Sequence, residues 1–299
     1  MSQFSQGLLS IDQLSDLEIM QVFQLARQFS ERGIDQLEAN SSLVVLQIFF
    51  EPSTRTRVSF EMAALRSGMK VIQVNVDSNT SKSKGESDAH TLANLQAMNP
   101  DIVVLRHGNF SEFLDAIDLN SIPTINAGDG SKGHPTQALL DGFTVLQEKG
   151  NLSGIKIGYM GDTKHSRVAR SGGKLFSRLG SEVFTCGPGI LTDETIGPKI
   201  SKQEMLRTCD VIVKLRLQKE RWQHSKEFSD TEFCLDLEDL ATAKTDSLIL
   251  HPGPFLLGED FTEPALSYPG IRILKQVENG VYVRAALLQL IAKEKYKNG

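Results

Sequence analysis

Apolar residues recur along the chain at two spacings, one typical of helices and the other of buried strands. Between Ile19 and Phe29 they return every three or four positions, which predicts an amphipathic helix. Ser15 and Glu18 form a capping box at its start. The next run, LVVLQIFF over 43–50, is continuously apolar and rich in β-branched residues. Such a run favours a strand that is buried on both faces.

Strands and helices continue to alternate after this first pair. In the first half the pattern predicts helices over 54–66, 86–98, 111–118 and 135–149, and strands over 71–76, 101–106 and 122–126. In the second half it predicts strands over 155–160, 182–186, 210–217 and 246–252, helices over 168–179 and 280–297, and a loop over 187–198. Strands separated by helices imply right-handed crossovers and parallel sheets that are covered on both faces. We therefore expect an α/β fold of two doubly wound domains, each with a central parallel β-sheet flanked by helices.

Composition narrows the class of protein. The chain has 299 residues, of which 40% are hydrophobic and 23% charged, so disordered, collagen-like and coiled-coil proteins are disfavoured. The formal net charge of −5 argues against a nucleic-acid-binding surface, but a few arginines could still bind a small anion. Three cysteines without CxxC or metal-ligand spacing predict buried, reduced thiols, and no metal site is expected. No signal peptide or membrane-spanning run is evident, so we expect a cytoplasmic protein.

Polar groups suited to anion binding follow the predicted strands, where open α/β sheets bind their ligands. Directly after strand 43–50 the chain reads EPSTRTR from Glu51 to Arg57. Backbone N–H groups at a helix start, with hydroxyl and guanidinium donors beside them, suit a phosphate. The alternative is an ordinary helix cap, with Arg57 paired to Glu61.

Two further strand ends carry candidate groups. Arg106 ends one strand, and the loop after strand 122–126 contains His134 and Gln137. The positive end of the helix dipole and nearby arginines favour a neutral imidazole at His134, which could donate a hydrogen bond to a carbonyl oxygen. A lone histidine could equally be structural.

The second half offers arginines and one stiff turn. Arg167 follows the strand at 155–160, and Arg216 and Gln218 face the same way after the strand at 210–217. The HPGP turn that begins at His251 can present backbone carbonyls to a ligand. Gly158 to Asp162 lacks the GxGxxG pattern, so a dinucleotide site is disfavoured.

Five motifs in this order make the set specific: STRTR, HPTQ, GDxKHSRVARS, LRxQKER and HPxP. Over nearly the whole chain they resemble the catalytic chains of the aspartate carbamoyltransferase family, within the aspartate/ornithine carbamoyltransferase superfamily. The resemblance implies transfer of a carbamoyl group from carbamoyl phosphate to L-aspartate in pyrimidine synthesis, without cofactor or metal. It also implies an active site in the inter-domain cleft. The turn reads HPGP where some members carry HPLP.

The resemblance implies a role for each matching residue. The carbamoyl-phosphate-binding domain would be 1–138 and the aspartate-binding domain 139–283, with a helix over 284–299 returning to the first domain. Carbamoyl phosphate would be bound by Ser53, Thr54, Arg55, Thr56, Arg106, His134, Gln137, Gly253 and Pro254, of which Arg55, Thr56, Arg106, His134 and Gln137 would be catalytic. Aspartate would be bound by Arg167, Arg216, Gln218 and Lys84.

The resemblance also implies an assembly. Ser81 and Lys84 lie in a polar loop that would enter a neighbouring subunit's site, which implies a homotrimer with shared active sites. Regulatory or dihydroorotase chains are possible further partners. Glu51, Arg167 and Arg221 match an ion-pair set that holds the closed state; from sequence alone a surface salt bridge is an equal alternative.

Three other functions fit the sequence less well. Ornithine carbamoyltransferase shares STRTR and HPTQ, but its HCLP turn and Ser-Met-Gly loop are absent, and a pair of arginines would repel a cationic side chain. A non-catalytic scaffold chain would not need every one of these polar positions. A nucleotide-binding Rossmann protein would need the missing glycine pattern.

Overall fold

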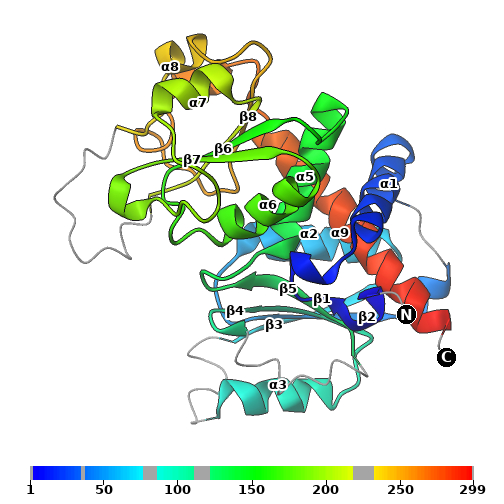
Figure 1. Cartoon of the computed structure of the whole chain (residues 1–299). Coiled ribbons are helices and arrows are strands. Elements are labelled where there is room, and N and C mark those ends of the chain that lie inside the picture. Colours follow the sequence, from blue (N-terminus) through cyan, green and yellow to red (C-terminus); the bar gives the residue numbers. More distant parts are fainter. Residues whose placement is uncertain (1–2, 35–37, 77–85, 111–121, 218–231, 298–299) are drawn as a thin grey trace. The chain divides into compact units, whose positions relative to one another are not determined.

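The computed structural model describes residues 3–34, 38–76, 86–110, 122–217 and 232–297. The chain divides into two compact units: Met1–Phe143 with Val277–Gly299, and Thr144–Gln276. Helix α5 (Pro135–Lys149) carries the chain out of the first unit, and helix α9 (Ile273–Lys297) carries it back. Each unit contains one parallel sheet flanked by helices (Figure 1), as the pattern predicts.

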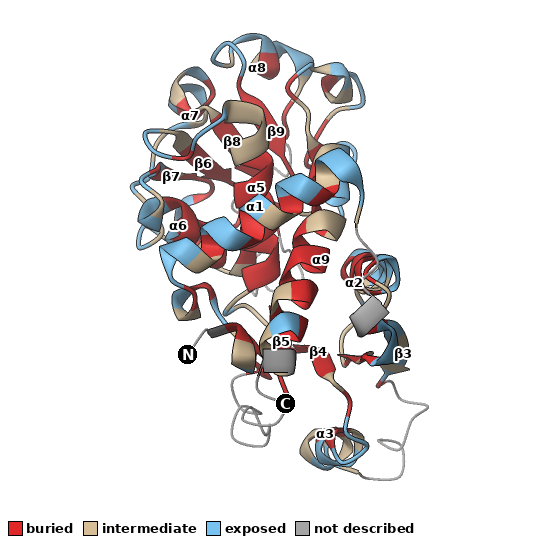
Figure 2. Cartoon of the chain, turned by 90° about the vertical axis from the view of Figure 1, so that its right-hand side faces the viewer, coloured by how far each residue is buried: buried red, intermediate tan, exposed pale blue. Residues whose placement is uncertain are grey.

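The sheet of the first unit has strand order β1-β5-β4-β2-β3 among the described residues. The strands are β1 (Gly7–Leu8), β2 (Val44–Phe49), β3 (Lys70–Asn75), β4 (Ile102–His107) and β5 (Thr124–Asp129), all paired in parallel. Strands β2, β4 and β5 are almost wholly buried. Strand β3 at the edge is largely exposed (Figure 2). The continuous apolar runs thus form the centre of this sheet, as buried parallel strands require.

Helices of the first unit pack onto the two faces of this sheet. They are α1 (Asp16–Arg32), α2 (Thr54–Arg66), α3 (Asp88–Gln96) and the parts of α5 and α9 in this unit. Leu92 of α3 joins the core formed by alternate residues of β2 and β4, including Leu46 and Val103. The predicted capping box of α1 is present, because Ser15 accepts from the Glu18 N–H and Glu18 accepts from the Ser15 N–H.

The sheet of the second unit has strand order β7-β6-β8-β9 among the described residues. Its strands are β6 (Lys156–Met160), β7 (Glu182–Cys186), β8 (Val211–Lys214) and β9 (Leu248–Leu250). Its helices are α6 (Arg167–Arg178), α7 (Lys202–Thr208) and α8 (Leu237–Ala241). Buried residues of α7 and α8 pack with the sheet in one apolar core, in which Met205 and Leu240 meet Ile212 and Ile249.

Some elements differ from the sequence prediction. The short helices α7 and α8 and the two-residue β1 were not predicted, because they are too short to show a period. Helix α9 begins at Ile273 rather than at 280, so Gly280 lies inside the helix. A Cβ at Gly280 would lie 2.5 Å from Arg284 Nη1 and 3.3 Å from Leu140 Cδ2. Close packing therefore accounts for this glycine. The helix predicted over 111–118 lies outside the described residues.

Candidate active site

Three neighbouring strands of the first sheet place the residues that are predicted to bind a phosphate and a carbonyl oxygen at one edge of the sheet. Strand β4 lies between β2 and β5, and all three run in the same direction. In the register of the sheet, Phe49 is opposite Arg106 and His107 is opposite Asp129. The loops that follow these strands therefore start side by side at the carboxyl edge of the sheet, where open α/β sheets bind ligands.

The loop after β2 leads into α2 through Ser53. The serines before α1, α3, α6 and α7 each accept a capping hydrogen bond from their helix, but Ser53 makes no such side-chain bond. The first backbone bond of α2 runs from Arg57 N to Ser53 O, so the N–H groups of the first turn have no acceptor within the helix. Thr56 is buried and Arg55 is exposed. This helix start can therefore receive an anion.

Arg57, in the same turn, forms a hydrogen bond with a residue of another strand. Its Nη1 donates to Asn75 Oδ1 at the end of β3, at 3.0 Å. The alternative pairing of Arg57 with Glu61 is therefore not the contact that forms. Arg55 and Arg57 are two residues apart and differ in their surroundings.

Arg106, at the end of β4, is 7% exposed. Its Nη1 donates to the Ala127 carbonyl on β5 at 3.3 Å, and its Nη2 lies 3.4 Å from Glu51 Oε2. The guanidinium is thus held between the loop after β2 and strand β5. Gly130, after β5, has a φ of 43°, and a Cβ there would lie 2.1 Å from the Gly108 carbonyl oxygen. Only glycine permits this approach of the two loops.

His134 and Gln137 stand at the start of α5, and both are buried. The His134 carbonyl accepts from the N–H groups of Gln137 and Ala138. Gln137 Nε2 donates to Asp141 Oδ1, one helical turn later, at 2.9 Å. Because the amide nitrogen of Gln137 faces Asp141, its Oε1 remains an acceptor for a ligand N–H group. Asp141 is not among the residues predicted from the sequence, although its four-residue spacing from Gln137 is a recognisable signal.

Asp141 has a buried arginine in its surroundings. Burial lowers the pKa of the Arg284 guanidinium to about 10, and the charge of Asp141 opposes that shift. Arg284 Nη1 donates to Ser59 Oγ at 2.7 Å, which links α9 to α2. Its guanidinium carbon also lies 5.1 Å from the centre of the Phe60 ring. Helix α9 thus contacts α2 through Arg284, and the charge of the same arginine acts on Asp141 of α5.

The second sheet places another set of predicted residues at its own carboxyl edge. Arg167 is the first residue of α6, whose N-cap Ser166 accepts from the Ala169 N–H. Arg216 comes two residues after β8, and the turn from His251 to Pro254 follows β9. The φ of Gly253 is 67°, a backbone conformation that favours glycine, so the HPGP form of the turn suits its geometry.

Four of the predicted site residues, Ser81, Lys84, Gln218 and Arg221, lie outside the described residues. Their roles stay predictions. The ion-pair set of Glu51, Arg167 and Arg221 and the shared cleft stay predictions as well.

The cysteines match their predicted state, because Cys186, Cys209 and Cys234 are all buried free thiols. Burial raises the pKa of Cys186 to about 12 and that of Cys209 to about 11. Within the described residues no group of three or more His, Cys, Asp or Glu side chains could hold a metal ion. None of the helices described is long and apolar enough to cross a membrane.

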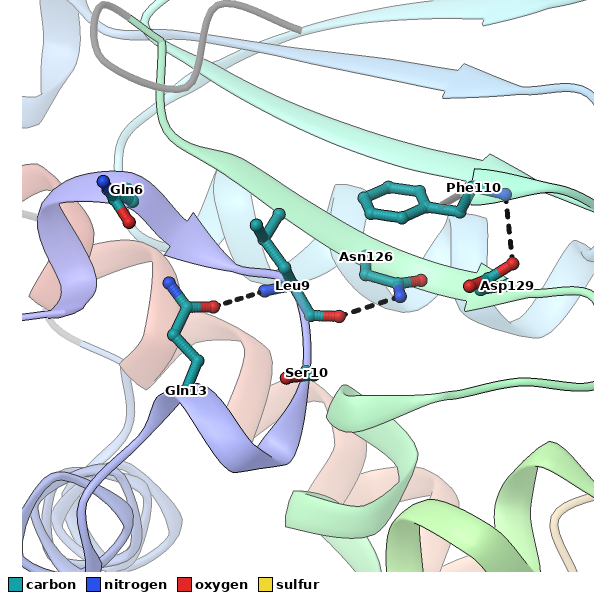
Figure 3. A pocket seen from close by; sticks show the side chains of 7 residues that line it. All are labelled: Gln6, Leu9, Ser10, Gln13, Phe110, Asn126 and Asp129. Atoms are coloured by element: carbon teal, nitrogen blue, oxygen red, sulfur yellow. Dashed lines mark hydrogen bonds between the residues drawn. The ribbon is translucent and has the colours of Figure 1, made fainter. Parts of the chain in front are cut away.

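A cavity of about 370 Å³ lies beside the N-terminal segment of the first unit (Figure 3). Gln13 Oε1 accepts from the Leu9 N–H, and Asn126 Nδ2 donates to the Leu9 carbonyl, so this wall is held by hydrogen bonds (Figure 3). The lining residues are Gln6, Leu9, Ser10, Gln13, Phe110, Asn126 and Asp129. They include a carboxylate and no cation, so the lining does not suit a phosphate.

Comparisons with known proteins match both halves of the chain. Residues 6–147 match the family model described as the aspartate/ornithine carbamoyltransferase carbamoyl-P binding domain, and residues 153–291 match the Asp/Orn binding domain. The aspartate carbamoyltransferase catalytic subunit of Solibacter usitatus is 38% identical, covering 95% of this chain and 98% of that protein. The corresponding subunit of Sorangium cellulosum is 39% identical, covering 96% and 93%.

Solved structures are similar over the same length. The catalytic subunit of M. jannaschii aspartate transcarbamoylase has a TM-score of 0.85 and 30% identity, covering 97% of this chain and 98% of that one. Aspartate transcarbamoylase from Trypanosoma cruzi, in complex with carbamoyl phosphate and aspartate, has a TM-score of 0.85 and 28% identity, covering 94% and 95%.

Proposed function

The chain belongs to the aspartate/ornithine carbamoyltransferase family, and we propose how its residues carry out the reaction. It transfers the carbamoyl group of carbamoyl phosphate to the amine of L-aspartate, giving N-carbamoyl-L-aspartate and phosphate, in pyrimidine synthesis. The assignment of individual residues rests on the edge of the first sheet. There Ser53 follows β2, His134 follows β5, and Arg106 lies at the end of β4 between these two strands.

The phosphate of carbamoyl phosphate binds at the start of α2. Its oxygens accept from the unpaired N–H groups of the first helical turn and from the hydroxyls of Ser53, Thr54 and Thr56. The Arg55 guanidinium adds charge-assisted hydrogen bonds. The side chain of Ser53 accepts no capping bond, which supports this assignment, because a capped helix start would have fewer N–H donors for the ligand.

The carbonyl oxygen of the carbamoyl group faces Thr56, Arg106 and His134. Attack by the uncharged amine of aspartate places negative charge on this oxygen. Donors that are already fixed in place stabilise that charge without reorganisation. Arg106 is fixed in this sense, because Glu51 and the Ala127 carbonyl hold its two terminal nitrogens.

The carbamoyl nitrogen is an N–H donor and needs acceptors. Gln137 Oε1 is one, because Asp141 holds the amide nitrogen of Gln137. The carbonyls of Gly253 and Pro254 are the others. The leaving phosphate can take the proton of the attacking amine, so the transfer needs no separate protein base.

The carboxylates of aspartate bind to Arg167, Arg216 and Gln218. Guanidinium groups form bidentate hydrogen bonds with carboxylates, which suits a dicarboxylic substrate. Lys84 and Ser81 of a neighbouring copy complete the site. The second unit thus supplies the residues that bind the amino acid, and the first unit supplies the residues that bind the phosphate.

The activity is tested by measuring N-carbamoyl-amino-acid formation from carbamoyl phosphate with aspartate or ornithine. We expect turnover with aspartate, and a 10²- to 10³-fold lower kcat for Arg106→Ala, the order of loss that follows removal of one oxyanion donor. Arg32→Ala, at an exposed arginine at the end of α1, serves as the control and keeps full activity. Turnover with ornithine but not aspartate would contradict the proposal.

We propose that the active assembly is a homotrimer. An apolar stripe on α2 supports self-association, because Val58, Met62 and Leu65 are exposed at helical spacing. The neighbouring β3 is an exposed edge strand (Figure 2). Its Ile72 is half-exposed. Light scattering on the purified chain should give the mass of three copies; a monomer mass at assay concentration would refute this assembly. We place the enzyme in the cytoplasm, where buried free thiols stay reduced.

A further inference from the structure

A lysine is buried at the end of a strand in the second unit, where the function assigned above does not use it. The side chain of Lys214 has no exposed surface, and that of its partner Asp260 is 1% exposed. Lys214 Nζ donates to Asp260 Oδ1 at 2.9 Å and to the carbonyl oxygen of its neighbour Leu215 at 3.0 Å. The three residues before Lys214 on β8 are apolar and buried.

A contribution to folding stability does not by itself explain why this ion pair is buried. Around it lies an apolar core that includes Leu235 and Phe261. Removing two charges from water is costly, and an apolar pair of similar volume is often equally or more stabilising. Burial lowers the pKa of the Lys214 ammonium, so its charged form depends on Asp260. Burial alone would raise the pKa of Asp260, but the nearby His251 and Lys214 outweigh it and hold that pKa well below its usual range.

The second carboxylate oxygen of Asp260 reaches the turn after β9. Asp260 Oδ2 accepts from the Leu256 N–H at 2.9 Å and lies 3.6 Å from His251 Nε2. One carboxylate thus contacts the lysine at the end of β8, the first residue of the HPGP turn, and the segment just beyond it.

His251 in turn binds the backbone of the HPGP turn. Its Nδ1 accepts from the Gly253 N–H at 2.7 Å, so the ring nitrogen that carries a proton is Nε2, which faces Asp260. The backbone N–H of His251 donates to Gln276 Oε1 at 3.1 Å. Its ring also packs edge-on against Phe255 and Phe261. The imidazole therefore has one orientation.

We propose that Lys214, Asp260 and His251 form a positioning relay that holds two substrate-binding segments in register. At one end, Lys214 lies two residues before Arg216 and binds the carbonyl between them. At the other end, His251 holds the N–H of Gly253, whose carbonyl is assigned to the carbamoyl nitrogen. The relay rests on the proposed function, because it acts only through Arg216 and the Gly253–Pro254 carbonyls. Its residues are positioning residues and touch no substrate.

The test is a double-mutant cycle on the full-length enzyme. Lys214→Met, Asp260→Asn and the double variant are compared by kcat and by KM for aspartate and for carbamoyl phosphate. All assays run at a temperature where circular dichroism shows each variant folded. We expect each single variant to lose at least 10-fold in kcat, and the double variant to lose no more than the worse single one, because the two groups act as a unit. A purely structural role would lower Tm and leave kcat per folded enzyme unchanged.

Lys244→Met provides the matched control. Lys244 Nζ lies 2.7 Å from Asp210 Oδ1 in the same unit, but that pair is partly exposed, so kcat should change less than twofold. Should Lys214→Met fail to fold, Asp260→Asn, which keeps the side-chain shape, decides the outcome. Folded relay variants with kcat and both KM values within twofold of the parent would overturn the relay. A parent enzyme without carbamoyl transfer to aspartate would overturn the proposed function instead.

Discussion

Arg55 and Arg57 offer the sharpest test of where phosphate binds. They lie two residues apart on α2, but Arg57 donates to Asn75, whereas Arg55 has no such partner among the described residues. Each is changed to alanine in turn. We expect Arg55→Ala to weaken phosphate binding and Arg57→Ala to leave it nearly unchanged.

The expected size follows from the contact that is lost. A hydrogen bond to a charged group contributes about 1.5–3 kcal/mol, and a loss of about 2 kcal/mol corresponds to roughly 30-fold in Kd. At phosphate equal to 100 times the parent Kd, binding stabilises the folded parent by about 2.7 kcal/mol. The same phosphate concentration stabilises Arg55→Ala by only about 0.9 kcal/mol.

The assay is thermal unfolding with and without inorganic phosphate, with sodium chloride at the same ionic strength as the control. At about 2–4 °C per kcal/mol, the Tm of the parent and of Arg57→Ala should rise by about 5–11 °C, and that of Arg55→Ala by about 2–4 °C. Equal protection of all three proteins would refute phosphate binding at the start of α2. Equal loss in the two variants would show that only net charge matters.

Three further predictions concern stability and thiol reactivity. In urea titrations, Gly130→Ala should lower the free energy of unfolding by about 1–3 kcal/mol more than Gly33→Ala does. Both glycines have a positive φ, but only a Cβ at Gly130 would meet another loop. Equal losses of stability in the two variants would refute the contact. Iodoacetamide at pH 8 should alkylate Cys186 at least about 100-fold more slowly in the folded than in the unfolded chain, because burial raises the thiol pKa and so suppresses the reactive thiolate. Mass spectrometry measures the labelling, and equal rates in the two states would contradict this prediction. The pKa of Asp260 is lower in the folded than in the unfolded chain, so its stabilisation is present above about pH 4 and is lost as the pH falls through the folded-state pKa. The stability difference between the parent and Asp260→Asn should therefore shrink from pH 7 to pH 3, and a constant difference would contradict the assignment.

Local sequence signals predicted the elements and the site residues that depend on neighbours along the chain. The helix over 54–66 is confirmed to the residue, because a polar start, a helical period and a glycine stop all lie within one short segment. The strand predicted over 182–186 is also confirmed to the residue. Strand ends are where α/β sheets bind ligands, so the groups after β2, β4 and β5 could be selected as candidates before their contacts were known.

Contacts between distant residues decided the rest. The apolar period predicts a helix that begins at 280, but Gly280 lies inside α9, where a Cβ would meet Leu140 and Arg284. The pairing of Lys214 with Asp260 joins residues 46 positions apart, and no local period signals it. A sequence pattern records which side chains are buried, whereas the partner of a buried charge depends on which strands become neighbours. The sequence by itself thus determined the fold class and the chemistry available at the sheet edges, and the tertiary structure decided which groups hold that chemistry in place.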